Sequence, residues 1–151
     1  MNPDECLFCK IVKSEIPSKK VYEDKDVLAF LDINPANPGH TLVVPKKHSE
    51  DITGTHESDL TKTMEVVKKI TAMLKENMHA EGVNIIQNNG RAAGQLVAHV
   101  HFHVVPRFHG DSVMISYPKI PISDVEMDSI CKKMSAEQHY APARRDLDLE
   151  F

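Results

Sequence analysis

The chain has 151 residues and a formal net charge of −4 at pH 7; 41% of its residues are hydrophobic and 26% are charged. These values are typical of one globular domain and argue against a disordered chain, and the longest apolar run, at 27–31, is far shorter than the ~20 residues of a membrane helix. The acidic balance argues against nonspecific nucleic-acid binding, which needs a basic surface. With only three cysteines and no apolar leader at its start, we expect a cytoplasmic protein with reduced thiols.

The first part of the chain predicts a short helix followed by three strands. The helix, at 10–15, should end before Pro17, because a residue that precedes proline disfavours helical angles. Strands rich in apolar and β-branched residues are predicted at 19–24, 27–33 and 40–46. The loop at 34–39 contains two prolines and one glycine, which fits a turn between the second and third strands.

The middle of the chain predicts one long helix and two more strands. Apolar residues recur at spacings of three and four over 58–78, as Leu60, Met64, Val67, Ile70, Leu74 and Met78. Strands are predicted at 82–89 and 99–107, with a flexible turn at 90–94 between them. Strands with short connections and one main helix indicate an α+β domain built on an antiparallel sheet.

The pattern weakens beyond residue 110. Ser123 and Glu126 have the spacing of a capping box, which predicts a second helix at about 123–134. No periodicity continues to the end of the chain. We therefore predict a domain at 1–110 and a C-terminal extension at 111–151, which holds one helix and an irregular tail.

Three histidines alternate with apolar residues in HVHFHVV, at 99–105. Side chains alternate between the two faces of a strand, so His99, His101 and His103 should share one face while the residues between them pack against the helix. A merely solvated face usually carries threonine, lysine, glutamate or serine instead. The row of imidazoles therefore favours metal binding, proton transfer or nucleophilic catalysis near neutral pH.

A metal and a nucleophile are the two kinds of chemistry that this row allows. Neighbours on one face of a strand lie ~6–7 Å apart, whereas zinc–nitrogen bonds are ~2.0–2.1 Å long, so three such histidines close poorly on one ion. A nucleophile flanked by hydrogen-bond donors fits better, because phosphoryl transfer depends on positioning and on neutralising oxygen charge.

A second group of residues has the composition of a zinc site. Cys6 and Cys9 form a C-x-x-C pair, and together with His48 and His99 they provide two thiolates and two imidazoles. The spacing is not that of a zinc finger, so the fold must assemble the site. The alternative is a pair of reduced cysteines packed among apolar residues.

Taken together, these motifs resemble the histidine triad (HIT) family of nucleotide hydrolases and transferases. HVHFHVV matches the family motif at each position, and FLDINPANPGHTLVVPKKH, at 30–48, and NNG…GQ, before the triad, occur in the family's order. The resemblance extends over about residues 6–107. It implies a sheet of five antiparallel strands with two main helices, continued across a homodimer, and a site for a purine nucleotide.

The resemblance also implies roles for individual residues. His101 would attack the α-phosphorus and form a covalent nucleotidyl-histidine, His103 would hold phosphate oxygens, and His40 would be the fourth histidine of the site. The other implied nucleotide contacts are Asp32 with the ribose, Phe8, Ile16 and Ile33 around the base, and Asn88, Gly94 and Gln95 near the phosphate. The implied ligands of a structural zinc are Cys6, Cys9, His48 and His99.

Three functions remain open at this point. The first is hydrolysis of purine nucleoside phosphoramidates of the AMP-amine type, and the second is hydrolysis of diadenosine polyphosphates. The third is a nucleotide-binding or scaffold role in which catalysis is incidental. Leu96 stands where many phosphoramidases of the family have a serine, so the leaving-group preference stays open.

Overall fold

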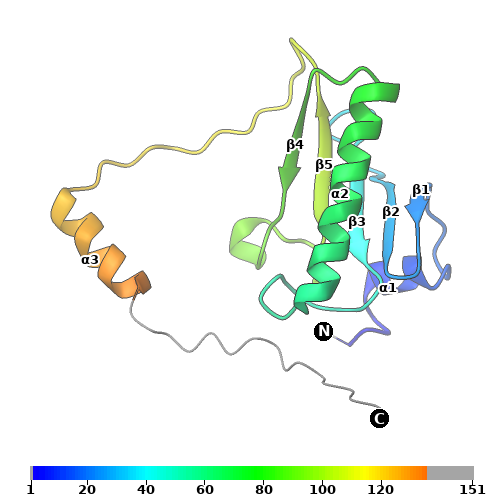
Figure 1. Ribbon diagram of the computed structural model, residues 1–151, viewed down its shortest axis with the longest axis horizontal. Coiled ribbons are helices and arrows are strands. Elements are labelled where there is room, and N and C mark those ends of the chain that lie inside the picture. The colour runs from blue at the N-terminus through cyan, green and yellow to red at the C-terminus, as the bar shows by residue number, and fades with distance from the viewer. Residues whose placement is uncertain (1, 136–151) are drawn as a thin grey trace. The chain divides into compact units, whose positions relative to one another are not determined.

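A computed structural model describes residues 2–135 of the chain (Figure 1). It divides into two compact units, the first of which is Met1–Val113 and the second of which begins at Met114. Most of the predicted irregular tail, 136–151, lies outside the described residues. The predicted domain boundary at residue 110 stays a prediction.

The first unit is built on a five-stranded sheet in which all neighbouring strands are antiparallel. The strands are β1 (Lys20–Glu23), β2 (Val27–Leu31), β3 (Thr41–Pro45), β4 (Gly82–Ile86) and β5 (Phe102–Arg107), in the spatial order β1-β2-β3-β5-β4. β3 and β5 are thus neighbours although they are far apart in the sequence. The predicted α+β class and the five predicted strands are confirmed.

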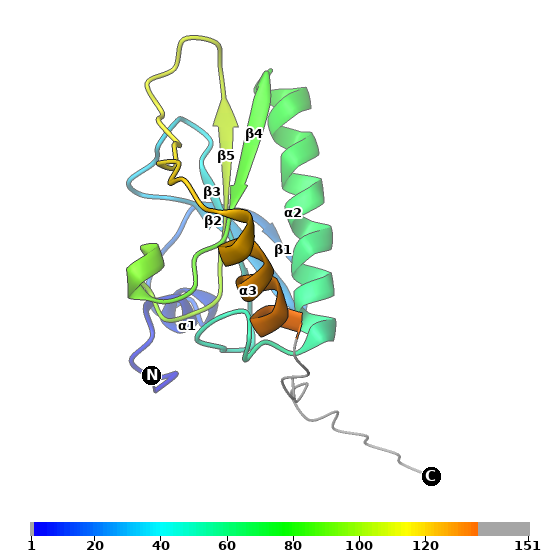
Figure 2. The ribbon, with the colours of Figure 1, turned by 90° about the vertical axis from the view of Figure 1, so that its left-hand side faces the viewer.

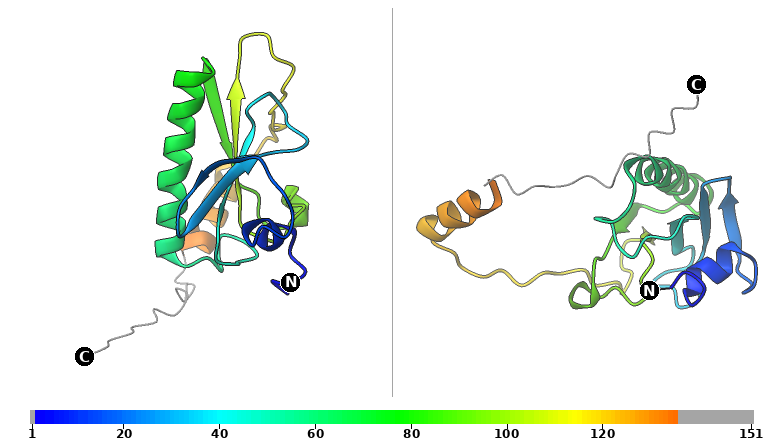
Figure 3. Two further views of the ribbon diagram at one scale, coloured as in Figure 1. Left: turned by 90° about the vertical axis from the view of Figure 1, so that its right-hand side faces the viewer. Right: turned by 90° about the horizontal axis from the view of Figure 1, so that it is seen from below.

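Helices cover both faces of this sheet. The long helix α2 (Glu57–Asn77) lies along one face and the short helix α1 (Leu7–Val12) lies on the other, as Figures 2 and 3 show. α1 begins and ends three residues before the predicted helix, and Ser14, just beyond its end, has a left-handed φ of 61° that stops it. Helical layers on both faces explain the uninterrupted apolar sequence of β2, because each of its faces is buried.

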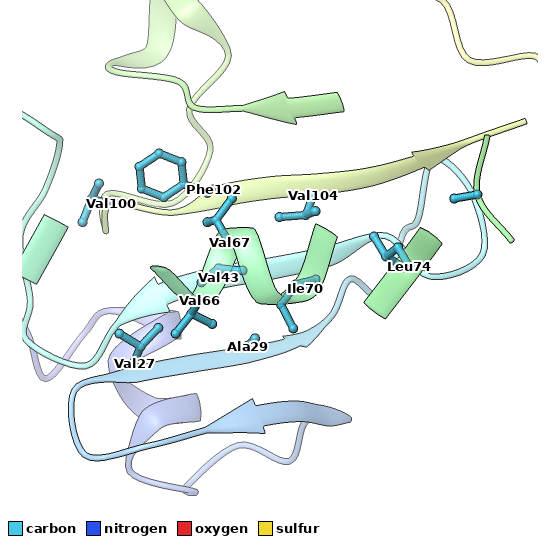
Figure 4. Packing of buried hydrophobic residues seen from close by; sticks show 11 residues of the cluster. Val27, Ala29, Val43, Val66, Val67, Ile70, Leu74, Val100, Phe102 and Val104 are labelled. Atoms are coloured by element: carbon cyan, nitrogen blue, oxygen red, sulfur yellow. The ribbon is translucent and has the colours of Figure 1, made fainter. Parts of the chain in front are cut away.

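The two faces of the sheet carry separate apolar clusters. Val27, Ala29 and Val43 pack under α2, together with Val100, Phe102 and Val104 (Figure 4). Leu28, Phe30, Leu42 and Val44 point to the other face and pack with α1. The apolar residues between the histidines therefore face α2, as predicted, which leaves the α1 side for the histidines.

The buried face of α2 differs from the predicted stripe. Met64 and Met78 are 41% and 40% exposed, whereas Thr63 and Val66 are buried beside Val67. The hydroxyl of Thr63 donates to the backbone carbonyl of Asp59, so its burial leaves no unpaired donor. In the sequence Thr63 counts as a polar residue, although its hydroxyl is paired within the helix and can be buried. The apolar pattern therefore predicted Met64, and not Thr63, on the face of α2 that contacts the sheet.

The segment before β5 is not the strand that the sequence predicts. β5 begins at Phe102, so only His103 of the three histidines lies in the strand. The Val100 amide donates to the carbonyl of Ser49 (2.7 Å), and the His99 amide donates to that of Val97 (2.9 Å). These bonds draw residues 99–101 away from ladder pairing with β3. His99 and His101 nevertheless share a face, because the Phe8 ring contacts both imidazoles.

The second unit contains the helix α3 (Asp124–Ser135). The Glu126 amide donates to Ser123 Oγ (3.3 Å) and the Ser123 amide donates to Glu126 Oε2 (3.0 Å), which confirms the predicted capping box. Every residue of α3 is exposed. None of the helices within residues 2–135 has the length and apolar character needed to cross a membrane.

Candidate active site and metal centre

A cavity of about 380 Å³ opens on the α1 side of the sheet. Its wall includes seven residues that the sequence analysis assigned to a nucleotide site: Phe8, Ile16, Asp32, Ile33, Gly94, His101 and His103. They come from α1, the α1–β1 connection, the β2–β3 connection, the loop after η1 (Arg91–Ala93), and β5 with the residue just before it. The fold therefore gathers residues from five segments around two histidines of the triad.

Several wall residues were not predicted. Ile11, Leu42 and Val97 line the cavity. Leu96, which stands where many phosphoramidases of the family have a serine, lines it as well. Ile11 lies three residues after Phe8 on α1, and Leu42 lies two residues after His40, so helical and strand periodicity would have placed them beside predicted residues. The side chain of Leu96 is 95% exposed at the cavity.

Asn88 and Gln95 are not among the residues that line this cavity. Gln95 is buried, and its side chain accepts from the Gly90 amide (2.7 Å) and donates to the carbonyls of Glu50 (2.6 Å) and Val97 (3.0 Å). These bonds occupy both ends of the Gln95 amide. The residue fixes the loop that carries Gly94 and Leu96, and its predicted contact with phosphate stays a prediction.

The ring of His101 is held by a backbone carbonyl. Its Nδ1 lies 2.6 Å from the carbonyl oxygen of His99, which can only accept, so Nδ1 carries the proton and donates. In the neutral ring Nε2 is then left with a free electron pair. Burial lowers the pKa of His101, and the ring is 5% exposed. This combination keeps the imidazole neutral and nucleophilic near neutral pH.

His40 and His103 form a hydrogen-bonded pair with a defined direction. The Ala36 amide donates to His40 Nδ1 (3.1 Å), so the proton of the neutral His40 ring is on Nε2. That Nε2 lies 2.9 Å from His103 Nδ1 and donates to it, which leaves the proton of His103 on its own Nε2. Burial lowers the pKa of His40 and, with the neighbouring imidazoles, lowers that of His103 to about 4.

His101 and His103 thus have complementary properties at one end of the cavity. Their ring centroids lie 5.0 Å apart. The neutral His101 ring has a free electron pair on Nε2, and the neutral His103 ring has an N–H on its Nε2. An electron-pair donor beside a hydrogen-bond donor is the arrangement that attack on an electrophilic centre with charged oxygens requires.

The four predicted metal ligands meet behind α1. The Sγ atoms of Cys6 and Cys9 both lie 3.5 Å from His99 Nδ1, while His48 Nδ1 lies 3.4 Å from the Cys9 sulfur and 3.3 Å from His99 Nδ1. In a tetrahedral zinc site, with bonds of ~2.3 Å to sulfur and ~2.0–2.1 Å to nitrogen, ligand atoms stand roughly 3.3–3.8 Å apart. These four distances therefore fit a tetrahedral zinc ion.

The surroundings of this cluster also suit a cation. His99 Nε2 lies 2.8 Å from the carbonyl of Pro45 and donates to it, so Nδ1 is the nitrogen available to a metal. Burial, with the Cys6 thiol close by, raises the pKa of the Cys9 thiol to about 11. The Cys9 thiol is thus hard to ionise alone, and a bound cation would favour its thiolate form.

Asp32, His40 and His103 form a second group with metal-binding atoms close together. Asp32 Oδ2 lies 3.7 Å from His40 Nε2. The hydrogen bond from Ala36 places the His40 proton on that same Nε2, so a metal there would have to displace the proton and break the bond to Ala36. The group therefore suits a hydrogen-bond relay better than a metal.

Comparison with known proteins agrees with this geometry. The family model described as the HIT domain matches residues 13–110. An uncharacterised HIT-like protein of Methanocaldococcus jannaschii is 49% identical over 129 residues, which cover 85% of this chain and 98% of the relative. The adenosine 5'-monophosphoramidase of Schizosaccharomyces pombe is 38% identical over 133 residues, which cover 87% of this chain and 97% of the yeast enzyme.

A solved structure with a bound metal is also similar. It is the crystal structure of a Zn-bound histidine triad family protein from Mycobacterium smegmatis, which is 38% identical. The match has a TM-score of 0.71 and covers 90% of this chain and all of the other.

Proposed function

The chain belongs to the HIT domain family, and from this premise we propose that it hydrolyses purine nucleoside phosphoramidates of the AMP-amine type. The observation that carries the proposal is the buried His101 ring, whose Nδ1 is tied to the His99 carbonyl while its ring faces a cavity that His103 also lines. The name of the similar yeast enzyme, adenosine 5'-monophosphoramidase, agrees with this reaction.

In the first step His101 Nε2 attacks the α-phosphorus. A bond forms between nitrogen and phosphorus, the bond from phosphorus to the amine breaks, and the departing amine takes a proton from solvent at the open side of the cavity. The His101 ring becomes positively charged, and the His99 carbonyl, 2.6 Å from its Nδ1, stabilises that charge. The Nε2–H of His103 donates to a phosphate oxygen as negative charge develops there.

In the second step water hydrolyses the covalent intermediate. The water oxygen bonds to phosphorus, the bond between phosphorus and His101 breaks, and the water proton passes to solvent. The nucleoside monophosphate leaves and His101 returns to its neutral form. His40 keeps the His103 ring in the same tautomer throughout, because the Ala36 amide continues to occupy its Nδ1.

The rest of the cavity provides the nucleotide contacts of the proposal. Phe8, Ile16 and Ile33 enclose the base with apolar surface, and Ile33 is 92% exposed and thus available to a ligand. The Asp32 carboxylate accepts from the ribose hydroxyls. Its Oδ1 already accepts from the Asn34 amide (2.8 Å), which holds the carboxylate in place. Gly94 lines the same cavity, and its amide donates to the Arg91 carbonyl (2.9 Å), which fixes the loop beside the phosphate position.

We assign a structural zinc to Cys6, Cys9, His48 and His99. When bound, zinc supplies a cross-link between α1, the segment after β3 and the segment before β5. Those segments carry Phe8 and His101. The metal therefore supports the cavity wall, and no step of the reaction uses it.

We also propose a cytoplasmic homodimer. Thiolate ligands favour a reducing compartment. β4 lies at one edge of the sheet and pairs with β5 on one side, so its outer row of backbone groups can pair with a second copy. Ile85 in this strand is 48% exposed. Sedimentation equilibrium at micromolar concentration should give twice the mass of one chain, and the mass of a single chain would contradict the dimer.

A comparison of two substrate classes tests the proposed reaction. We expect kcat/KM for an adenosine phosphoramidate of a simple amine to exceed that for diadenosine polyphosphates by at least about tenfold. Faster cleavage of the polyphosphates would show that the leaving group is a nucleotide and not an amine. Tight nucleotide binding with no cleavage of either class would favour the scaffold role.

A further inference from the structure

A carboxylate outside the cavity collects five hydrogen bonds at the C-terminal end of β5. Asp111, whose side chain is 7% exposed, accepts from the following donors: Arg107 Nε (2.8 Å) and Nη2 (2.7 Å), the amides of Phe108 (3.0 Å) and Val113 (3.2 Å), and Asn37 Nδ2 (2.9 Å). So many donors exceed what a surface ion pair needs. The Arg107 guanidinium, with these other donors, holds the pKa of Asp111 far below its ordinary value, so the group is charged at neutral pH.

The side chains of Asp111, Arg107, Asn37 and Asn84 form one hydrogen-bonded group, the Asp111 hub. Arg107 fixes this hub to the sheet. Arg107 Nη1 donates to Asn84 Oδ1 in β4 (2.6 Å), and Arg107 Nη2 donates to the Val113 carbonyl (2.7 Å). Arg107 itself is the last residue of β5. The position of the Asp111 carboxylate is therefore determined by two strands, and not by a mobile side chain.

Asn37 connects the hub to the loop between β2 and β3. Its Nδ2 donates to the carbonyl of Pro106 (2.9 Å) as well as to Asp111 (2.9 Å). The residues at 33–36 and Pro38 are exposed, whereas Asn37 is half-buried. Among the residues at 33–38, Asn37 is thus the one whose side chain reaches into the folded unit and anchors the loop.

The same loop determines which nitrogen of His40 carries its proton. The His40 amide donates to the Asn37 carbonyl (3.0 Å), and the Ala36 amide donates to His40 Nδ1 (3.1 Å). A shift of the loop would remove the Ala36 donor. His40 could then carry its proton on Nδ1, and it would no longer donate to His103 Nδ1.

We propose that Asp111 and Asn37 are positioning residues for the reaction. They hold the loop so that Ala36 selects the His40 tautomer, and through it the Nε2–H that His103 directs to the phosphate. The inference rests on the proposed function for its kinetic part. Its structural part, the effect on the two tautomers, does not depend on which substrate is used.

The test compares Asn37→Ala with a matched control, Asn84→Ala, in the full-length zinc-loaded protein. The control also removes a side-chain amide from the Asp111 hub, but this amide lies in β4 and accepts from Arg107. Ring ¹⁵N shifts of His40 and His103, measured with long-range proton–nitrogen correlation, report the tautomers. Single-turnover kinetics on an adenosine phosphoramidate report the chemical step, and thermal unfolding measures the stability of each variant.

We expect Asn37→Ala to mix the tautomers of both histidines and to lower the turnover rate by roughly 10- to 100-fold with little change in KM. Asn84→Ala should lose comparable stability and keep both the tautomers and the rate, because Arg107 still donates to Asp111 and to the Val113 carbonyl, and Asn37 still donates to Asp111. If Asn37→Ala does not fold, Asp111→Asn is measured in its place, with the same expectation.

Unchanged tautomers and rate in Asn37→Ala would overturn the inference, as would an equal loss of rate in Asn84→Ala. If the wild-type protein cleaves no phosphoramidate, the proposed function fails. The tautomer measurement then still decides whether Asn37 and Asp111 position the histidines.

Discussion

The rings of His101 and His103 lie side by side, with centroids 5.0 Å apart, yet backbone groups of different segments fix the proton on different nitrogens. The His99 carbonyl holds it on Nδ1 of His101. The Ala36 amide, acting through His40, holds it on Nε2 of His103. Both rings can stay neutral. The contact on His101 leaves its Nε2 free to act as a nucleophile, and the contact on His103 leaves its Nε2–H free to act as a donor.

Two substitutions of His103 should distinguish its role as a hydrogen-bond donor from its role in packing. His103→Ala removes the donor to the phosphate and should lower kcat by roughly 10²-fold. His103→Gln keeps an N–H of similar reach and should retain more activity than the alanine variant. Steady-state kinetics on an adenosine phosphoramidate measure both, with thermal unfolding to show that each variant is folded. Equal activity in all three proteins would remove His103 from the mechanism.

At Asp111 the charge should make stability depend on pH. Its pKa lies below the ordinary value of 3.8, chiefly because of the Arg107 guanidinium, so the folded protein binds this proton less readily than the unfolded chain does. The stabilisation is therefore fully present above pH ~4 and is lost as the pH falls further. Urea unfolding should show a constant gap in free energy between wild type and Asp111→Asn from pH 7 to 5 that narrows below pH ~4. A gap that widens in acid would contradict this assignment.

Among the structural elements, α1, the segment after β3 and the segment before β5 bring the four proposed metal ligands together. Their four ligand atoms come from three separate parts of the chain and lie within 4.8 Å of one another. Cys6, just before α1, and Cys9, within it, lie on either side of Phe8, whose ring packs edge-on against His101 with centroids 5.1 Å apart. Loss of the metal should therefore disturb the cavity as well as the stability.

Removal of the metal gives a prediction with an internal control. Cys9→Ala should abolish binding of about one zinc per chain and lower the melting temperature by at least roughly 8 °C, because a structural zinc stabilises by more than ~2 kcal/mol. Cys131→Ala changes an exposed cysteine in α3 and should alter neither quantity. Elemental analysis and calorimetry measure both effects. A folded wild-type protein without zinc would refute the metal assignment.

The elements also show how much the sequence could predict. The strands and the long helix have clear periodicity, and the local capping box at Ser123 holds in the structure. The irregular segment at 99–101 was missed because its partner is the Ser49 carbonyl, about fifty residues earlier, and no local pattern records such a bond. The pair of Asn37 and Asp111, 74 residues apart, was missed for the same reason. The triad and the C-x-x-C pair were found because short motifs carry them.

On the scale of the whole molecule, the two faces of the sheet have different roles, since one forms the core and the other forms the site. One face packs on α2 and forms the larger apolar core, and the other carries α1, the cavity and the metal ligands. Burial on the α2 side fixes the register of β3 against β5, in which Leu42 lies opposite His103. The polar site can therefore be built on one face at little cost to the core on the other.

The division of the chain predicts that the first unit is self-sufficient. The cavity, the metal ligands and the Asp111 hub all belong to Met1–Val113. A chain that ends at Val113 should fold and bind zinc. It should keep kcat/KM for an adenosine phosphoramidate within about threefold of the full-length value. A folded truncated protein with strongly reduced activity would assign a role in substrate binding to the C-terminal unit.

The most direct test of the account is to trap the intermediate and locate it. The protein is mixed with a slow adenosine phosphoramidate analogue, quenched within one turnover, digested and sequenced by mass spectrometry. We predict one adenylyl group per active chain, attached to His101 through Nε2, and none in His101→Ala. An adduct on another residue, or turnover at the wild-type rate by His101→Ala, would contradict the central claim.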